Sequence, residues 1–302
     1  MKQILRTTAG EMRRILCSTG FWLSVGLTVI ILMTSTMYKE TDGTTYSLFT
    51  LGMHFDKLQL QNFGIFAQRD FSTLVLYTLP MYGPLLAALS FGTSLCEEQK
   101  YGVRRYVLFK EGKLPYVLSK AISAICASGL AFLIGAGIIL LFMYWRYPLM
   151  STMDTASYQM WMEHYFADAD GITKLLFSWF GEHAFSILVL FGVVLYGVFC
   201  GFIGYICTAF FSNVYLAVCI PFFFGYVYYS ITQALMARMT EGAVSIEVYN
   251  AINSYVSPEG YMAFWRQKES FGVNMMVLLA VWIMAIVIQL VRLQKAADCG
   301  VK

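Results

Sequence analysis

The chain has 302 residues, of which 58% are hydrophobic and only 13% are charged, and its mean hydropathy is +0.62. A soluble globular protein carries about 25% charged residues, so this composition excludes an ordinary soluble enzyme. Disorder is also excluded, because a chain with 17% aromatic residues is too hydrophobic to remain solvated. The net charge of +3 is too small to indicate a nucleic-acid partner. The composition therefore predicts a single membrane domain over residues 1–302.

Uncharged runs mark the places where a helix of about 20 residues can cross about 30 Å of hydrocarbon. The first three runs are 15–38, 71–96 and 121–145. The next stretch has 55 residues without a charged side chain and would measure about 80 Å as one helix. It must therefore fold into two spans, 184–211 and 214–236, with a turn at Ser212-Asn213. The last run is 271–291.

These runs predict an all-α polytopic protein with six transmembrane helices. A β-barrel is excluded because the runs are continuously apolar and do not alternate. Pro80 and Pro84 should kink the second span, which makes them either a hinge or the site of a static kink. Gly197-x-x-x-Gly201, with Gly204 one turn on, permits close helix approach in the fourth span. Packing inside the chain is favoured there over contact with a second copy.

The distribution of Lys and Arg predicts which ends of the spans face the cytoplasm. The two termini and segment 97–120 together carry 13 Lys and Arg, whereas the other connections carry 8. By the positive-inside rule, both termini are cytoplasmic. The first run is longer than a signal-peptide core, so we expect it to be retained as a span. The outer segments 39–70, 146–182 and 238–270 are long enough to form a lid or a gate, or ordinary packed loops.

Seven cysteines lie in or beside the spans or in the C-terminal tail, and none lies in an outer segment or in a C-x-x-C motif. We therefore expect neither a disulfide framework nor a metal site.

The connection after the second span, residues 97–120, is the most informative one. If it is helical from Tyr101 onward, it forms a short amphipathic helix at the membrane surface. One face then carries Val103, Tyr106 and Val107, and the other carries Tyr101, Arg104, Arg105 and Leu108. Such a helix lies on anionic lipid headgroups or docks a cytoplasmic partner, and both readings stay open at this point.

These residues resemble the type-2 ABC exporter permeases. Members of that family have six spans, cytoplasmic ends, an amphipathic N-terminal elbow helix and a cytoplasmic coupling helix after the second span. The positions that match are Glu98, Gly102 and the run 116–120, and the opening 11–22 resembles the elbow and the start of the first span. Val103 departs from the family, in which Thr is common after the glycine.

The resemblance implies a non-catalytic transport subunit in the cytoplasmic membrane, of the kind found in the bacterial inner membrane. The sequence contains no G-x-x-x-x-G-K-[ST] loop, so ATP and Mg would be bound by a partner ATPase and no cofactor by this chain. The complex would hold two ATPase copies and a second permease chain, identical or different. The substrate would be a peptide, drug or lipid-like molecule, with antimicrobial-peptide resistance favoured. The ATPase-facing residues would be Glu98, Tyr101, Gly102, Arg104, Arg105 and Leu108.

Two other functions remain alternatives. An ion-coupled secondary transporter needs no ATPase, but it commonly keeps an ionisable residue near the bilayer midplane, and the six runs contain no Asp, Glu, Lys or Arg. An intramembrane protease would use the Glu97-Glu98 pair, but Gly102 stands where its motif requires Arg. The three histidines are also expected on the opposite side of the membrane.

Overall fold

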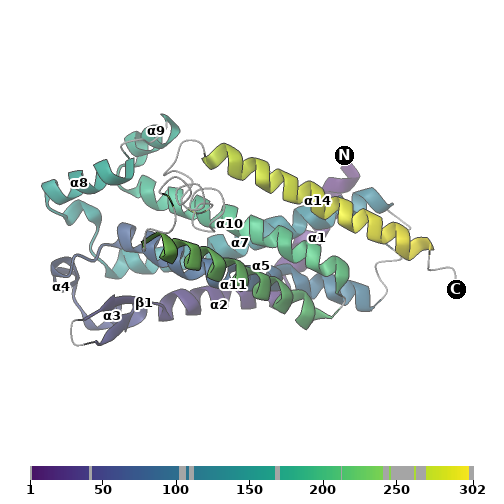
Figure 1. Cartoon of the computed structure of the whole chain (residues 1–302), viewed down its shortest axis with the longest axis horizontal. Helices are drawn as coiled ribbons and strands as arrows, with labels where there is room; N and C mark the ends of the chain where they lie inside the picture. The colour runs from purple at the N-terminus through teal and green to yellow at the C-terminus, as the bar shows by residue number, and fades with distance from the viewer. Residues whose placement is uncertain are drawn as a thin grey trace.

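Long helices dominate the computed structural model, and most of them run roughly along its long axis (Figure 1). The structure describes residues 2–40, 43–101, 107–108, 112–166, 171–211, 213–240, 245, 262 and 270–298. Within these residues, five helices are long and apolar enough to cross a membrane. They are α5 Ala67–Lys100, α7 Lys113–Arg146, α10 His183–Phe210, α11 Val214–Thr240 and α14 Ser270–Asp298. The chain therefore has the architecture of an all-α, multi-pass membrane protein.

These five helices cover the five uncharged runs after the first. The turn expected at Ser212-Asn213 separates α10, which ends at Phe210, from α11, which begins at Val214. Ser212 itself lies outside the described residues. The Asn213 side-chain oxygen accepts a hydrogen bond from the Tyr215 N–H at 2.9 Å and helps to start α11. The length of apolar sequence that a helix needs to cross the bilayer thus predicts the positions of these five helices.

The first run, 15–38, is not one helix. It divides into the end of α1 (Lys2–Leu16) and all of α2 (Thr19–Thr34), and the axes of the two helices differ by 59°. Ser18 causes the break, because its extended backbone begins α2 and its hydroxyl accepts a hydrogen bond from the Phe21 N–H at 3.3 Å. With 16 residues, α2 is about 24 Å long. Counting the bent pair as one span gives the sixth candidate.

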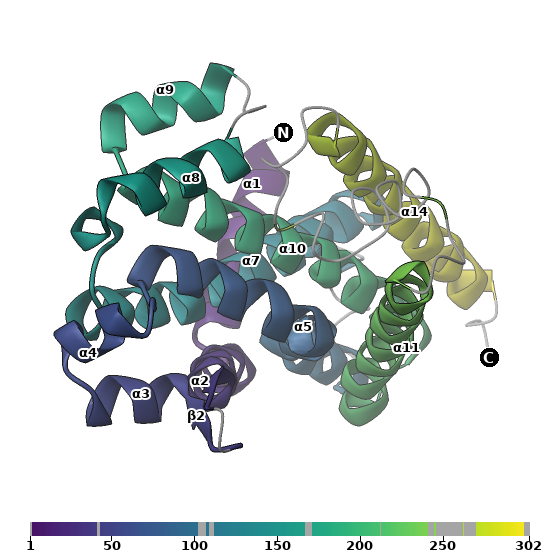
Figure 2. The ribbon, with the colours of Figure 1, turned by 60° about the vertical axis from the view of Figure 1, so that its left-hand side comes forward.

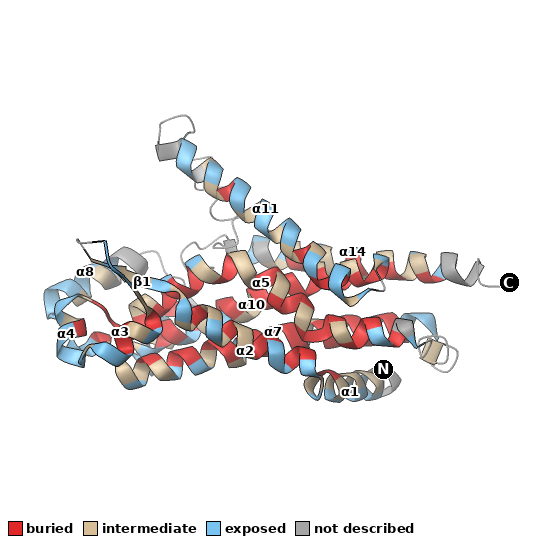
Figure 3. Ribbon diagram, turned by 90° about the horizontal axis from the view of Figure 1, so that it is seen from below, coloured by how far each residue is buried: buried red, intermediate tan, exposed pale blue. Residues whose placement is uncertain are grey.

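The bundle has a well-packed centre and a looser side. Helix α10 packs against α5 and α7, and α2 packs against the same two helices. Helix α1 lies outside this group, mainly against α7, at the end of the bundle that we call the α1 end (Figure 3). Burial is concentrated in α5, α7 and α10, whereas α11 and α14 keep many exposed apolar residues (Figure 3).

Shorter elements cover the opposite end, which we call the α8 end (Figures 1 and 2). After α2 the chain forms an antiparallel pair of strands, β1 Thr36–Lys39 and β2 Thr45–Ser47. Two short helices, α3 Leu48–His54 and α4 Lys57–Asn62, then lead into α5. After α7 come the 3-10 turn η1 Met150–Thr152 and the helices α8 Thr155–Phe166 and α9 Gly171–Phe180.

Segments 39–70 and 146–182 are bonded to each other at this end. The Ala67 N–H donates to the Pro148 carbonyl at 2.9 Å, and the Met150 N–H donates to the side-chain oxygen of Gln68 at 3.0 Å. The buried Tyr147 hydroxyl donates to the Leu48 carbonyl at 2.6 Å. Segments 39–70 and 146–182 thus contain helices and strands of their own. Of 238–270, only 238–240, Ser245, Met262 and Ser270 are described.

Candidate functional site

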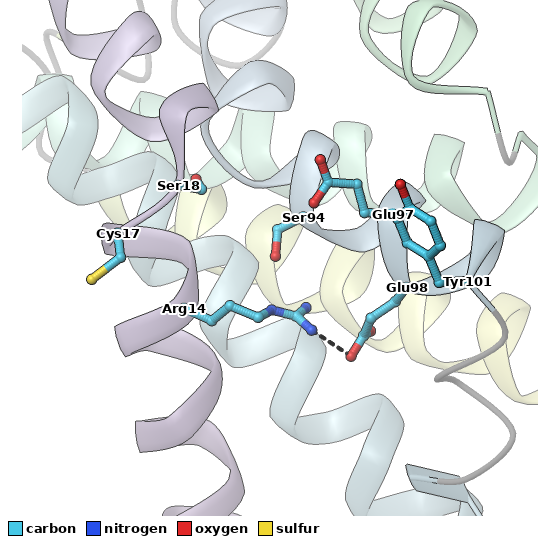
Figure 4. Close-up of a pocket in the computed structure, with 7 residues that line it drawn as sticks. All are labelled: Arg14, Cys17, Ser18, Ser94, Glu97, Glu98 and Tyr101. Atoms are coloured by element: carbon cyan, nitrogen blue, oxygen red, sulfur yellow. Dashed lines mark hydrogen bonds and ion pairs between the residues drawn. The ribbon is translucent and has the colours of Figure 1, made fainter.

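Four charged side chains from three helices meet at the α1 end. Glu11 and Arg14 come from α1, Glu98 from the last turns of α5, and Lys120 from the early turns of α7. The Lys120 ammonium lies 2.5 Å from the Glu11 carboxylate and 2.7 Å from that of Glu98. The Arg14 guanidinium lies 2.7 Å from the Glu98 carboxylate (Figure 4). It lies 3.0 Å from the Glu11 carboxylate. We call these four residues the ionic cluster.

Three side chains of the ionic cluster are shielded from solvent, whereas that of Arg14 is 39% exposed. The side chain of Lys120 is 2% exposed and that of Glu98 is 3% exposed. Two acids and two bases balance, so the cluster carries no net charge. Removing one partner from such a buried group leaves an uncompensated charge and typically costs about 3–5 kcal/mol. The cluster therefore fixes α1 against α5 and α7.

Tyr116 completes the site from one turn before Lys120. Its hydroxyl donates to the Glu98 carboxylate at 3.3 Å, and the Lys120 nitrogen lies 5.5 Å from the centre of its ring. The i, i+4 spacing of Tyr116 and Lys120 puts both on the face of α7 that meets the end of α5. The i, i+3 spacing of Glu11 and Arg14 does the same on α1.

A pocket of about 410 Å³ opens beside the ionic cluster, between α1 and the end of α5 (Figure 4). Its rim includes Tyr101, whose side chain is 72% exposed, and the exposed Glu97. The pocket lies where the described part of α5 ends and segment 102–106 begins. The lining residues are Arg14, Cys17, Ser18, Ser94, Glu97, Glu98 and Tyr101.

The structure locates three of the six residues that we expected to face a partner. Tyr101 is exposed. The expectation for Glu98 is not met in this structure, because its carboxylate is buried and paired within the chain. Leu108 is half-buried and packs, like Val107, against the group formed by Tyr116, Val117 and Leu293. Val107 and Leu108 therefore do not lie on opposite faces of a helix, which is where the sequence pattern placed them. Gly102, Arg104 and Arg105 lie outside the described residues.

The two prolines of α5 have specific partners. Pro84 has no N–H, so the Pro80 carbonyl one turn earlier lacks its helical donor. The buried Tyr196 hydroxyl of α10 donates to that carbonyl at 3.0 Å. A Cβ on Gly83 would lie 2.5 Å from the Tyr196 ring, and one on Gly225 of α11 would lie 2.3 Å from the Pro84 ring. The part of α5 that contains the two prolines is therefore packed against both α10 and α11.

The glycines of α10 lie against helices of the same chain. A Cβ on Gly201 would lie 2.1 Å from the Ser128 hydroxyl, and one on Gly197 would lie 3.0 Å from the Phe132 ring, both on α7. A Cβ on Gly204 would meet Phe91 and Ala88 of α5 at 3.0–3.2 Å. The absence of side chains at these positions allows α10 to approach α5 and α7 closely.

Lys120, Glu11 and Arg14 are the residues of the site that sequence reasoning missed. Glu11 and Arg14 belong to the opening that resembles an elbow, and Lys120 ends the matching run 116–120, but neither pattern indicates an ion pair. A signal did exist, since a Lys at the border of a long apolar run needs a counter-charge when it is buried. In the part of the chain that the structure describes, no group of three or more His, Cys, Asp or Glu is arranged to hold a metal ion.

Comparisons with known proteins give this site no further assignment. No protein-family model matches the chain, and no curated protein matches it.

Proposed function

We propose that this chain is the membrane-spanning permease subunit of an ABC exporter, powered by ATP hydrolysis in a separate ATPase subunit. The observation that carries the proposal is the ionic cluster, in which Glu98 and Lys120 are paired with each other and with the N-terminal helix. These two residues flank segment 99–119, in which the ATPase contact is expected. The chain itself would be non-catalytic, with ATP and Mg bound by the partner.

The ionic cluster supports the role of a permease subunit because it links the expected ATPase contact to three helices. A partner that displaces segment 102–111 acts on the end of α5 and on the start of α7, because these are the two ends of that segment. Since both helices are held to α1 by buried ion pairs, the displacement moves three helices together and does not merely deform a loop. A cytoplasmic motor needs such a connection to change the populations of two transporter conformations.

The main alternative is an ion-coupled carrier, and the buried charges of the ionic cluster are the observation that favours it. Carriers of that kind place their ionisable groups near the bilayer midplane. Here Glu98 lies two residues before the end of α5, and Lys120 is the eighth residue of α7. The long uncharged runs lie between these residues and the α8 end. The position of the cluster therefore favours a coupling site over a transport site.

The proposal includes a location and a class of substrate. Both termini, and with them the α1 end, would face the cytoplasm, because that side carries most of the Lys and Arg. The membrane would be the cytoplasmic membrane of a bacterium. The exported molecule would be a peptide, a drug or a lipid-like molecule, and a second permease chain would complete the pathway.

The test is affinity purification of the full chain from its native membrane after mild cross-linking. We expect an ATPase subunit with a phosphate-binding loop to co-purify in near-equal amount. The variant Arg104→Glu/Arg105→Glu should lose this partner while remaining inserted in the membrane. The control variant Arg6→Glu/Arg13→Glu reverses two exposed charges on α1 and should retain it.

Two results would contradict the proposal. The first is unchanged recovery of the ATPase with the Arg104→Glu/Arg105→Glu variant. The second is uphill transport by the purified chain in nucleotide-free vesicles under an ion gradient, which would establish the carrier instead.

A further inference from the structure

Helix α9 has three chemically different sides. Thr173 is buried, and Leu176 and Phe177 pack against the hydrophobic core. At 3.6 residues per turn, Leu175 and Trp179 form a second stripe about 130° away. Trp179 is 70% exposed and Leu175 is also exposed. One side of α9 therefore faces the protein, and the separate apolar side formed by Leu175 and Trp179 remains exposed.

The third side of α9 is polar. Lys174 and Ser178 are exposed and lie about 100° from the Leu175 and Trp179 stripe. A helix surrounded by water has no need to separate its exposed apolar residues from its exposed polar ones. A helix buried in hydrocarbon does not carry an exposed Lys beside a Ser. The division is typical of a helix that lies in the interface plane, with lipid on one side and water on the other.

The position of α9 in the chain places it at a membrane boundary. It ends at Phe180, and the membrane-spanning helix α10 begins at His183. The tight connection uses Gly181 at a φ of 56°, a conformation that glycine adopts without strain. The Gly181 N–H donates to the Phe177 carbonyl at 2.9 Å, and the Ala184 N–H donates to the Gly181 carbonyl at 3.1 Å. Helix α9 thus lies on the rim of the α8 end, directly at the start of a span (Figure 2).

We propose that α9 is an interfacial anchor whose Leu175 and Trp179 side inserts into the lipid leaflet at the α8 end. Trp is the residue most suited to this depth, because its ring is largely apolar and its N–H reaches the headgroups. Lys174 then points to the aqueous side. This inference does not depend on the proposed transport function, since it concerns only the surface of one helix next to one span.

The test compares tryptophan emission of the full chain and of Trp179→Phe in nanodiscs. Phenylalanine does not emit in this range, so the difference spectrum reports Trp179 alone. We expect a blue-shifted difference spectrum that lipids brominated near the top of the acyl chain quench strongly and that aqueous iodide quenches weakly. Trp145→Phe is the matched control, because Trp145 is similarly exposed, at 68%, near the end of α7 on the same side of the molecule.

A red-shifted difference spectrum with strong iodide quenching would overturn the proposal by placing Trp179 in water. Protection from both iodide and brominated lipid would also overturn it and would indicate a protein contact, such as a second copy. Hydroxyl-radical footprinting of the unmodified chain gives an independent reading. In nanodiscs Trp179 should be oxidised as little as Trp145, and oxidation at the level of a solvent-exposed tryptophan would contradict the anchor.

Discussion

The Tyr196 hydroxyl donates to the Pro80 carbonyl, which is the carbonyl that Pro84 leaves without a helical N–H. A phenol on α10 thus replaces a backbone donor that is missing from α5. This hydrogen bond satisfies the buried Pro80 carbonyl inside a membrane protein, where no water molecule is available to donate to it. It also ties the proline-containing part of one span to the side chain of a neighbouring span.

Loss of this hydroxyl should destabilise the fold. We expect Tyr196→Phe to lower the free energy of unfolding by about 1–2 kcal/mol, because the Pro80 carbonyl loses its donor. In a Pro84→Ala background, where residue 84 again has an N–H for that carbonyl, the same substitution should cost much less. Thermal unfolding of the four variants in detergent measures this coupling, and the exposed Tyr77→Phe is the control. An equal cost in both backgrounds would show that the bond is not the cause.

The ionic cluster should behave as a unit. We expect Lys120→Met to destabilise the chain by about 3–5 kcal/mol, because Glu98 and Glu11 then share only Arg14 in a largely buried site. Adding Glu98→Gln to Lys120→Met should recover part of this loss, since the number of buried acids again equals the number of bases.

Unfolding midpoints of the single and double variants test the cluster, with Lys113→Met as the control because Lys113 is exposed on the same helix. Additive losses would contradict a coupled cluster.

The contact between α10 and α7 predicts a strong dependence on residue size. Gly201→Ala should lower the free energy of unfolding by about 1–3 kcal/mol, because its Cβ would lie 2.1 Å from the Ser128 hydroxyl. Gly137→Ala is the matched control on α7, since nothing lies within 4 Å of a Cβ at that position. Helix propensity favours alanine in both places, so only the close contact distinguishes the two variants. A neutral Gly201→Ala would mean that α10 and α7 can separate without cost.

The start of α8 should depend on pH. The Asp154 carboxylate accepts a hydrogen bond from the Ser157 N–H at 2.9 Å, and this bond, together with one from the Ser157 side chain, lowers the pKa of Asp154 below its ordinary value. The stabilisation of α8 is therefore complete above the unfolded-state pKa of Asp154 and is lost as the pH falls through the lowered value. The protection of the first-turn amides of α8, measured as their hydrogen-exchange rate relative to the intrinsic rate at the same pH, should fall over this acidic range. In Asp154→Ala the exchange should be faster throughout and should lack this step.

The sequence allowed the spans to be predicted but not the contacts between them. Runs such as 71–96 and 121–145 are readable because bilayer thickness sets a minimum apolar length. The break at Ser18 was missed, since hydropathy does not register a capping hydroxyl within an apolar run. The pairing of Glu98 with Lys120 depends on how α5 packs against α7, and the bond from Tyr196 to Pro80 joins residues 116 positions apart. Neither can be derived from local spacing.

The helices α5 and α7 are fastened to each other at both ends. The pair of Glu98 and Lys120 joins them at one end, and the bonds from Ala67 to Pro148 and from Met150 to Gln68 join them at the other. Each helix has 34 residues and is therefore about 50 Å long. Because α5 and α7 are joined at both ends, we expect them to move as one rigid unit. A small tilt imposed on the two helices at one face of the membrane is then transmitted to the opposite face.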